Sequence, residues 1–264
     1  MSTVARTLSF VGAYIKTNLQ MAMEYRASFI AQVFTMFLNN GMWLAFWYIY
    51  FTRFPILGDW RREDIVVLWS MLSLAYGLVN TVFGNVLQLS SIIVRGGLDF
   101  YLAHPRNVLL HLLISRMSFA AVGDIAFGLV VFLAWTEVTL ARLGLFFLSS
   151  IIAGLFLLAF TILAHSLAFF IGNAESLASE LFSAFIHFST YPTTIFGGLT
   201  RLLLFTLIPA GFVSSLPVRV IRQLDPIFLL YATGAGAVLM VIAYAVFSWG
   251  LSRYESGNLI VIRM

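Results

Sequence analysis

One acidic residue, Asp124, lies well inside a long apolar block at residues 108–135. A carboxylate among apolar side chains is costly unless it is paired, hydrogen-bonded or needed for function. Arg116, two turns away, becomes a partner only if a bend or a neighbouring helix brings the two groups together; otherwise a hydrogen-bond donor on another helix must serve. We favour a structural role over a proton-transfer site, because proton relays in apolar surroundings use several ionisable groups.

Uncharged polar side chains form a second set of candidates. Asn39 and Asn40 lie midway in the apolar block 27–51, where two adjacent amides are costly unless they face protein or water. Two roles fit them equally well: hydrogen bonds that hold helices together, or the wall of a path for a polar substrate group. The residues that we predict to line such a path are Asn39, Asn40, Asn80, Asn85 and His187.

Catalysis by the chain itself and a metal site are both disfavoured. Glu180 and His187 share a helix face, but no third ligand accompanies them, so we predict no metal. The histidines are dispersed and form no cluster with Ser, Asp or Glu of the kind that an intramembrane enzyme needs. A phosphate-binding loop with Gly ahead of Lys-Ser or Lys-Thr cannot occur, because the sole lysine, Lys16, stands in YIKTNLQ.

The composition indicates that lipid surrounds most of these residues. Of 264 residues, 61% are hydrophobic and 10% are charged, whereas soluble domains are about 25% charged. Cysteine is absent, which excludes disulfides and thiolate metal sites. The net charge of +4 comes mostly from single Arg residues near block ends, a pattern typical of membrane flanks and not of nucleic-acid binding.

We therefore predict an all-α integral membrane protein with a single transmembrane domain over residues 1–264. Six blocks are predicted spans: 27–51, 65–87, 108–135, 143–171, 174–191 and 227–250. In the second span, Gly77, Thr81 and Gly84 form a small-residue face for close helix packing. The end of the first span carries an aromatic belt suited to a membrane interface, composed of Trp43, Trp47, Tyr48 and Tyr50.

Three segments are not simple spans. Residues 1–25 predict an amphipathic interface helix, with an apolar stripe composed of Val4, Leu8, Val11, Ile15, Leu19 and Ala22. Residues 89–106, the longest polar interruption, combine a short apolar run, a glycine break and a Pro stop. Residues 195–213 are apolar but broken, and predict a re-entrant hairpin that enters and leaves the membrane on one side, with 214–226 following as an exterior segment. The hairpin is punctuated by Pro192, Gly197, Gly198 and Pro209.

Six spans leave both termini on the same side of the membrane. Lys and Arg number eight on the side of the termini and seven on the other side. The positive-inside rule therefore does not decide the orientation.

Several phrases in order along nearly the whole chain are similar to a known family. They are NLQMAMEYRASFIAQ before the first span, GGLDFYLAHPRN after the second, YPTTIFGGLTRLLLFTLIPAGFVSSLP before the sixth, and SRYESGN at the tail. Together with the interface helix, the polar bend and the broken hairpin, they resemble a permease subunit of bacterial type-2 ABC exporters. The resemblance extends to the branch that encodes one ATPase with two different permeases.

The resemblance implies that residues 92–102 form a coupling helix that docks into a cleft of a separate ATPase. Charged hydrogen bonds from Arg95 and Asp99 would accompany an apolar plug, while Gly96 and Gly97 permit a sharp turn. The apolar plug consists of Ile92, Ile93, Leu98, Phe100, Tyr101 and Leu102. An ordinary polar loop is the alternative.

The resemblance also implies partners and a location. Two ATPase copies would hold ATP and Mg²⁺, a second permease, predicted to be a different paralogue, would complete the pore, and the chain would lie in the bacterial inner membrane with both termini cytoplasmic. The first, second and fifth spans would line the pore and the hairpin would serve as its outer gate. Walls rich in Phe and Met suit a lipid-like or amphipathic drug-like cargo.

The rival function is an ion-coupled secondary transporter or channel subunit. That class is expected to show paired intramembrane acids or internal repeats. The chain has a single intramembrane acid and no convincing repeat, so we favour the ATP-driven permease.

Overall fold

The computed structural model describes residues 3–172, 174–224 and 227–255. The described chain is helical, apart from one isolated bridge between Leu57 and Trp60, so the predicted all-α class is confirmed. The helices with seven or more residues are α1 (Thr3–Glu24), α2 (Arg26–Arg53), α3 (Arg62–Phe83), α6 (Val108–Ser115), α7 (Val122–Trp135), α8 (Leu140–Ser166), α9 (Ala174–Ser189), α10 (Gly198–Thr206), α11 (Ala210–Gln223) and α12 (Ile227–Leu251). Shorter turns of helix are α4 (Leu89–Val94) and α5 (Leu98–Leu102), with 3₁₀ turns η1 (Gly84–Gln88), η2 (Phe119–Ala121), η3 (Leu167–Phe169) and η4 (Thr193–Ile195).

Four helical runs among the described residues are long and apolar enough to cross a membrane: Arg26–Arg53, Arg62–Val94, Leu140–Phe169 and Ile227–Leu251. The number rises to six if two bent pairs, α6 with α7 and α10 with α11, each count as one span. The predicted fifth span is not among them, because α9 has 16 residues and would be only about 24 Å long. Six conventional spans therefore remain a prediction.

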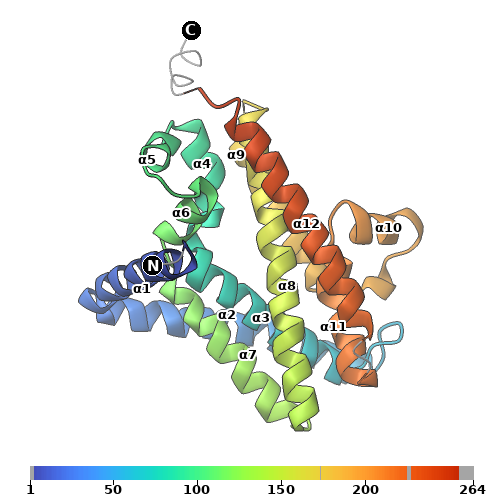
Figure 1. The fold of residues 1–264 in the computed structure, drawn as a ribbon. Helices are drawn as coiled ribbons and strands as arrows, with labels where there is room; N and C mark the ends of the chain where they lie inside the picture. Colours follow the sequence, from blue (N-terminus) through green and yellow to red (C-terminus); the bar gives the residue numbers. More distant parts are fainter. Residues whose placement is uncertain (1–2, 173, 225–226, 256–264) are drawn as a thin grey trace.

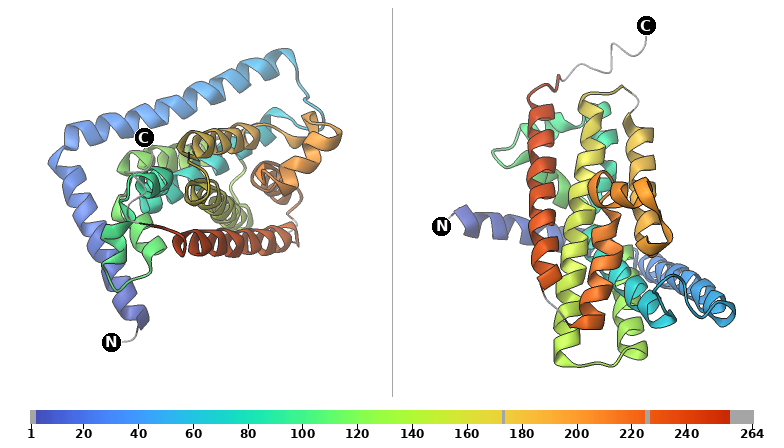
Figure 2. Two further views of the ribbon diagram at one scale, coloured as in Figure 1. Left: turned by 90° about the horizontal axis from the view of Figure 1, so that it is seen from above. Right: turned by 90° about the vertical axis from the view of Figure 1, so that its right-hand side faces the viewer.

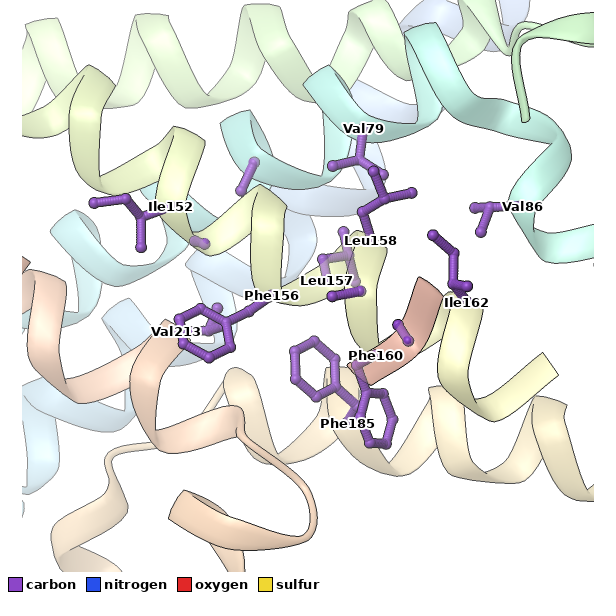
Figure 3. Close-up of a cluster of buried hydrophobic side chains, with 14 of the residues drawn as sticks. Val79, Val86, Ile152, Phe156, Leu157, Leu158, Phe160, Ile162, Phe185 and Val213 are labelled. Atoms are coloured by element: carbon purple, nitrogen blue, oxygen red, sulfur yellow. The ribbon is translucent and has the colours of Figure 1, made fainter. Parts of the chain in front are cut away.

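The centre of the molecule is α8, which packs against α3 on one side and α12 on the other. Seen from above, α12 and α2 lie on opposite sides of α8, and α1 and α2 form an arm that extends from the other helices (Figure 2). Figure 3 shows the core around α8: Val79 of α3 lies beside Leu158, Phe156 lies beside Val213 of α11, and Phe160 lies beside Phe185 of α9. The rings of Phe160 and Phe185 stack at 4.8 Å, which joins α9 to α8.

Glycines allow α7 to lie close against α3. A Cβ added to Gly77 would lie 2.8 Å from the Ile125 nitrogen, and one added to Gly84 would lie 2.8 Å from the Ser118 nitrogen. Gly128 on α7 is equally tight against α3 from the other direction, 2.5 Å from the Ser70 carbonyl oxygen. The predicted close-packing face of the second span is therefore confirmed.

The second helical run continues past residue 87, where we predicted its end. After the 3₁₀ turn η1, the chain resumes as α4 with Ser90 and Ser91 buried. The Ser90 hydroxyl lies 2.8 Å from His165 Nδ1 on α8. Polar residues that indicated an exit from the membrane are thus satisfied inside the protein, and the first six residues of the predicted 89–106 segment extend the run of α3.

The predicted third span is not one continuous helix. It bends by 70° between α6 and Phe119–Trp135, although the sequence contains neither Gly nor Pro at that point. The backbone N–H groups of Met117 and Ser118 donate instead to Asn18 Oδ1 and to the Asn80 carbonyl, both at 3.1 Å. Hydrogen bonds from other helices replace the intrahelical ones, and this replacement stabilises the bend.

The helix α1 packs on α6 and on the bend after it through Tyr14 and Asn18, at the edge of its predicted apolar stripe. Tyr14 Oη lies 2.7 Å from His111 Nε2, and Asn18 is buried. Of the stripe residues whose side chains are described, Ile15 and Leu19 are exposed, whereas Val11 and Ala22 are half-buried. Ile15 and Leu19 lie about 100° around the helix from Tyr14 and Asn18, respectively, which contact the rest of the chain.

We expect Asn18→Ala to detach α1, because the buried Met117 N–H would lose its acceptor, at a cost of about 1–3 kcal/mol. Cleavage by Lys-C at Lys16, the only lysine of the chain, should become about 5 to 150 times faster if opening of α1 limits cleavage. Gln20→Ala, an exposed amide on the same helix, is the control and should leave the rate unchanged. Equal rates in both variants would show that this hydrogen bond does not hold α1.

The segment after α9 contains the predicted break, with α10 and α11 at 83° to each other. The predicted exterior segment 214–226 is helical over most of its described part, because α11 continues to Gln223 and packs on α3 and α8. Its end is held by Arg222, whose Nε lies 3.3 Å from Asp64 Oδ1. Arg and Ser residues suggested an aqueous segment, whereas the apolar residues between them, such as Val218 and Ile221, are buried.

Candidate functional site

The intramembrane acid is the centre of a buried polar cluster on three helices. Asn40 Nδ2 of α2 donates to Asp124 Oδ1 of α7 at 2.6 Å, and Ser73 Oγ of α3 donates to Asn40 Oδ1 at 3.0 Å. The hydrogen-bond alternative for Asp124 is therefore confirmed, whereas Arg116 is exposed at the bend and forms no described ion pair with it. The second carboxylate oxygen, Oδ2, is buried and has no hydrogen-bond partner among the described residues.

This cluster borders a cavity of about 300 Å³ between α2, α3, α7 and α9. Asn39, Asn40 and His187 all line this cavity, so three of the five predicted path residues come together. The helices α2, α3 and α9 correspond to the first, second and fifth predicted spans. Their assembly around one cavity depends on tertiary packing that the spacing of the residues could not reveal.

Aromatic rings make up much of the cavity wall. Trp43 stacks on Trp69 with ring centroids 6.0 Å apart and planes at 13°, and Trp47 meets Tyr191 edge-on at 5.6 Å. Trp47 is 4% exposed. Trp47 is thus buried in the cavity wall, whereas Trp43 lines the cavity and remains 39% exposed. Trp69 and Ser73 of α3, which the sequence did not assign to the site, complete the wall.

The other two predicted path residues lie elsewhere. Asn85 Nδ2 donates to the Leu112 carbonyl and to Ser115 Oγ, both at 2.9 Å, and so joins η1 to α6. The side-chain amide of Asn80, Nδ2, donates to the Tyr76 backbone carbonyl at 3.0 Å. The backbone carbonyl of Asn80 accepts from the Ser118 N–H. Neither residue lines the cavity, and both hold the broken third block against α3.

The predicted coupling helix 92–102 is instead two short helices joined by a turn, hereafter the α4–α5 bend. Gly96 at the turn has φ +75°, a conformation that favours glycine, and the Gly97 N–H donates to the Ile92 carbonyl at 2.8 Å. The bend lies at the same end of the molecule as the start of α9 and the end of α12 (Figure 1).

The side chains of the α4–α5 bend divide into inward and outward sets. Leu98 and Ile93 are buried in the core of the chain itself, while Tyr101 is half-buried with its hydroxyl 3.0 Å from Ser115 Oγ. Ile92 also packs against the core. The outward residues are Arg95, Gly97, Asp99, Phe100 and Leu102, with Phe100 58% and Leu102 46% exposed.

The C-terminal end of α12 meets the α4–α5 bend. Tyr254 packs against the core cluster that contains Leu98, and its ring lies edge-on to Phe169. Burial raises the pKa of the Tyr254 hydroxyl, and the neighbouring Asp99 carboxylate raises it further. The bend is thus in contact with the ends of both α8 and α12. The last three residues of the SRYESGN phrase lie outside the described residues.

The residues that punctuate the hairpin have mixed environments. Pro192 and Pro209 are buried, whereas Gly197 and Gly198 are exposed, and Gly198 adopts φ +49°. A Cβ added to Gly58 in the α2–α3 loop would lie 3.0 Å from Thr194 Oγ1. Arg222 at the far end of α11 donates to the Asp59 carbonyl of the same loop at 3.3 Å. Thr194, just before α10, and Arg222, at the end of α11, therefore both lie against the α2–α3 loop. The segment from η4 to the end of α11 is hereafter the α10–α11 unit.

The described residues contain no group of three or more metal-ligating side chains. Glu180 and His187 are both exposed on α9. The chemistry that this arrangement supports is noncovalent binding in the cavity and contact at the α4–α5 bend.

The helical runs, the buried polar cluster and the cavity between helices are features of a multi-pass membrane protein. A family model described as "ABC-2 family transporter protein" matches residues 37–257, so the chain belongs to the ABC-2 transporter family. It is the membrane permease of an ABC transporter and not itself an enzyme; ATP is bound by a partner ATPase. Comparison with curated proteins and with solved structures gives no significant match.

Proposed function

We propose that this chain is one half of an exporter pore in a bacterial cytoplasmic membrane, driven by two copies of a separate ATPase through the α4–α5 bend. The observation that carries this proposal is the pair of exposed apolar side chains, Phe100 and Leu102, on a bend that the buried Ile93 and Leu98 anchor in the core. An apolar projection flanked by Arg95 and Asp99 suits a groove on a partner protein.

The contacts of the bend provide a route from the ATPase to the membrane helices. Leu98 is packed in the main core, Ser90 contacts His165 of α8, and Tyr101 contacts Ser115 of α6. A partner that binds one position of the bend more tightly would therefore bias the arrangement of α8 and α6 as well.

The cavity between α2, α3 and α9 is the proposed part of the translocation path. The rest of the chain covers little of α2: in its most apolar stretch of 18 residues, only 6% are buried. A second permease therefore has surface available there. On the resemblance to the heteromeric branch, we propose that this second permease is a different paralogue.

The α10–α11 unit is the proposed outer gate, as a re-entrant hairpin. Its support is the contact of both ends with the α2–α3 loop, through Thr194 and through Arg222. With the α4–α5 bend on the cytoplasmic side, that loop is exterior and both termini are cytoplasmic in this arrangement.

Purification of the tagged chain from its native membrane in mild detergent tests the proposal. We expect mass spectrometry to identify an ATPase with a phosphate-binding loop and a second permease of different sequence. A complex with two copies of this chain and the ATPase would contradict the heteromeric assignment alone. Recovery of the chain without any ATPase, with transport driven by an ion gradient, would favour the secondary-transporter rival.

A further inference from the structure

Asp124 lines the cavity, and one of its two carboxylate oxygens has no hydrogen-bond partner among the described residues. The residue is 5% exposed, Asn40 occupies one carboxylate oxygen, and Oδ2 has no partner among the described residues. An ionised carboxylate in a low-dielectric site strongly favours a positive charge nearby. Among the described residues that line the cavity, none is Lys or Arg.

The rest of the wall suits an organic cation better than a metal ion. Five aromatic side chains, Trp43, Trp47, Trp69, Tyr76 and Tyr191, line the cavity, and aromatic rings attract cations, most strongly when water is excluded. Calcium and magnesium ions instead need about six or more oxygen ligands, whereas the wall is mainly aromatic and aliphatic.

The size of the cavity sets the scale of the ligand. About 300 Å³ is at the lower end of the range for small-molecule sites, and it suits one ring with a substituted ammonium group. Asn39 and His187 at the wall can hydrogen-bond to a polar substituent.

We propose that this cavity binds a monovalent, amphipathic organic cation, with Asp124 Oδ2 as its counter-charge and the tryptophans of α2 and α3 around its apolar part. The proposal rests on the proposed function, because it names the substrate class of the same path. The sequence indicated a lipid-like or amphipathic cargo, and the proposal restricts this class to amphipathic cations.

Equilibrium binding of radiolabelled benzyltrimethylammonium to the purified complex in lipid nanodiscs tests this. We expect saturable binding that is at least ten times weaker in Asp124→Asn and restored in Asp124→Glu. The Asn variant keeps an oxygen to accept from Asn40, so the packing of α7 on α2 is retained. Glu175→Gln, which removes an exposed acid of α9 outside the cavity, should bind as the wild type does.

A second pair of variants tests the aromatic wall. Trp43→Leu should weaken binding several-fold, while Trp249→Leu, which removes an exposed tryptophan outside the cavity, should not. Neopentylbenzene, the neutral isostere of the probe, should not compete at the same concentration. Absence of saturable binding to the wild type, unchanged affinity in Asp124→Asn, or competition by the isostere would each overturn the proposal.

These results are distinguishable from failure of the proposed function. If the ATPase co-purifies and cation binding is absent, only the substrate class is wrong. If no ATPase co-purifies, the ATP-driven function is wrong, whatever the cavity binds.

Discussion

Replacing Phe100 and Leu102 by alanine should reduce recovery of the ATPase with the permease about tenfold or more. The two side chains are among the most exposed apolar residues of the α4–α5 bend. Exposed apolar groups of this kind act as anchors when they enter a pocket of a partner, and removal of an anchor typically costs about 2 kcal/mol or more. Quantitative mass spectrometry of the purified complex measures the ratio of ATPase to permease.

Two controls separate docking from folding. Leu140→Ala removes a 90% exposed leucine from the first turn of α8 and should leave the ratio unchanged, because α8 begins at the opposite end of the molecule from the bend (Figure 1). Leu98→Ala removes a fully buried side chain from the same bend and should lower the stability of the permease by about 2–5 kcal/mol. A full complement of ATPase on the Phe100/Leu102 double variant would show that the bend is not the docking site.

Gly128→Ala is expected to destabilise the permease although it adds only one methyl group. The added Cβ would lie 2.5 Å from the Ser70 carbonyl oxygen and 2.9 Å from the Leu74 nitrogen. Both are backbone atoms, so α7 must move away from α3. Overpacking of this kind costs about 1–3 kcal/mol, and sometimes more. Because Gly128 is one turn from Asp124, the shift also strains the Asn40–Asp124–Ser73 cluster.

Thermal unfolding in detergent, followed by tryptophan fluorescence, measures the effect. We expect Tm to fall by roughly 2–12 °C, on the basis of a cost of about 1–3 kcal/mol and about 2–4 °C per kcal/mol for chains of this size. Gly144→Ala on α8 is the control, because nothing lies within 4 Å of its added Cβ. There, the higher helix propensity of alanine should leave Tm equal or raise it slightly. A Tm for Gly128→Ala at or above that of the wild type would contradict the close packing of α7 on α3.

The approximate positions of the helices were predictable because hydrophobic block length and local punctuation are properties of neighbouring residues. The break near Gly197 and Gly198 and the turn at Gly96 were predicted in this way. The bend at residues 116–118 was not, because its cause is acceptors on Asn18 and Asn80, which are far away in sequence. The helical course of α11 was missed for a related reason: its polar residues are interspersed with side chains that α3 and α8 bury.

The candidate site shows the same division at single residues. An unpaired acid at residue 124 indicated a need for a partner, and the sequence narrowed the choice to an ion pair or a hydrogen bond. The identity of the donor, Asn40, depended on how α2 and α7 pack. The position of Asn39 and His187 at the same cavity depended on how α2 and α9 pack. Trp43 and Trp47 were predicted to belong to an interfacial belt because aromatic clusters near span ends usually do. Their place in the cavity wall depended on how α2 packs with α3 and α9.

By itself, the sequence determined that this chain is an all-helical membrane permease without an ATP site of its own, since composition, a single unsuitable lysine and the order of its phrases are local properties. Only the tertiary structure decided which polar residues share a cavity and which side chains of the α4–α5 bend remain outside the core. The physical reason is that burial and hydrogen-bond partners belong to pairs of helices, and no single helix contains the information about the one that it will meet.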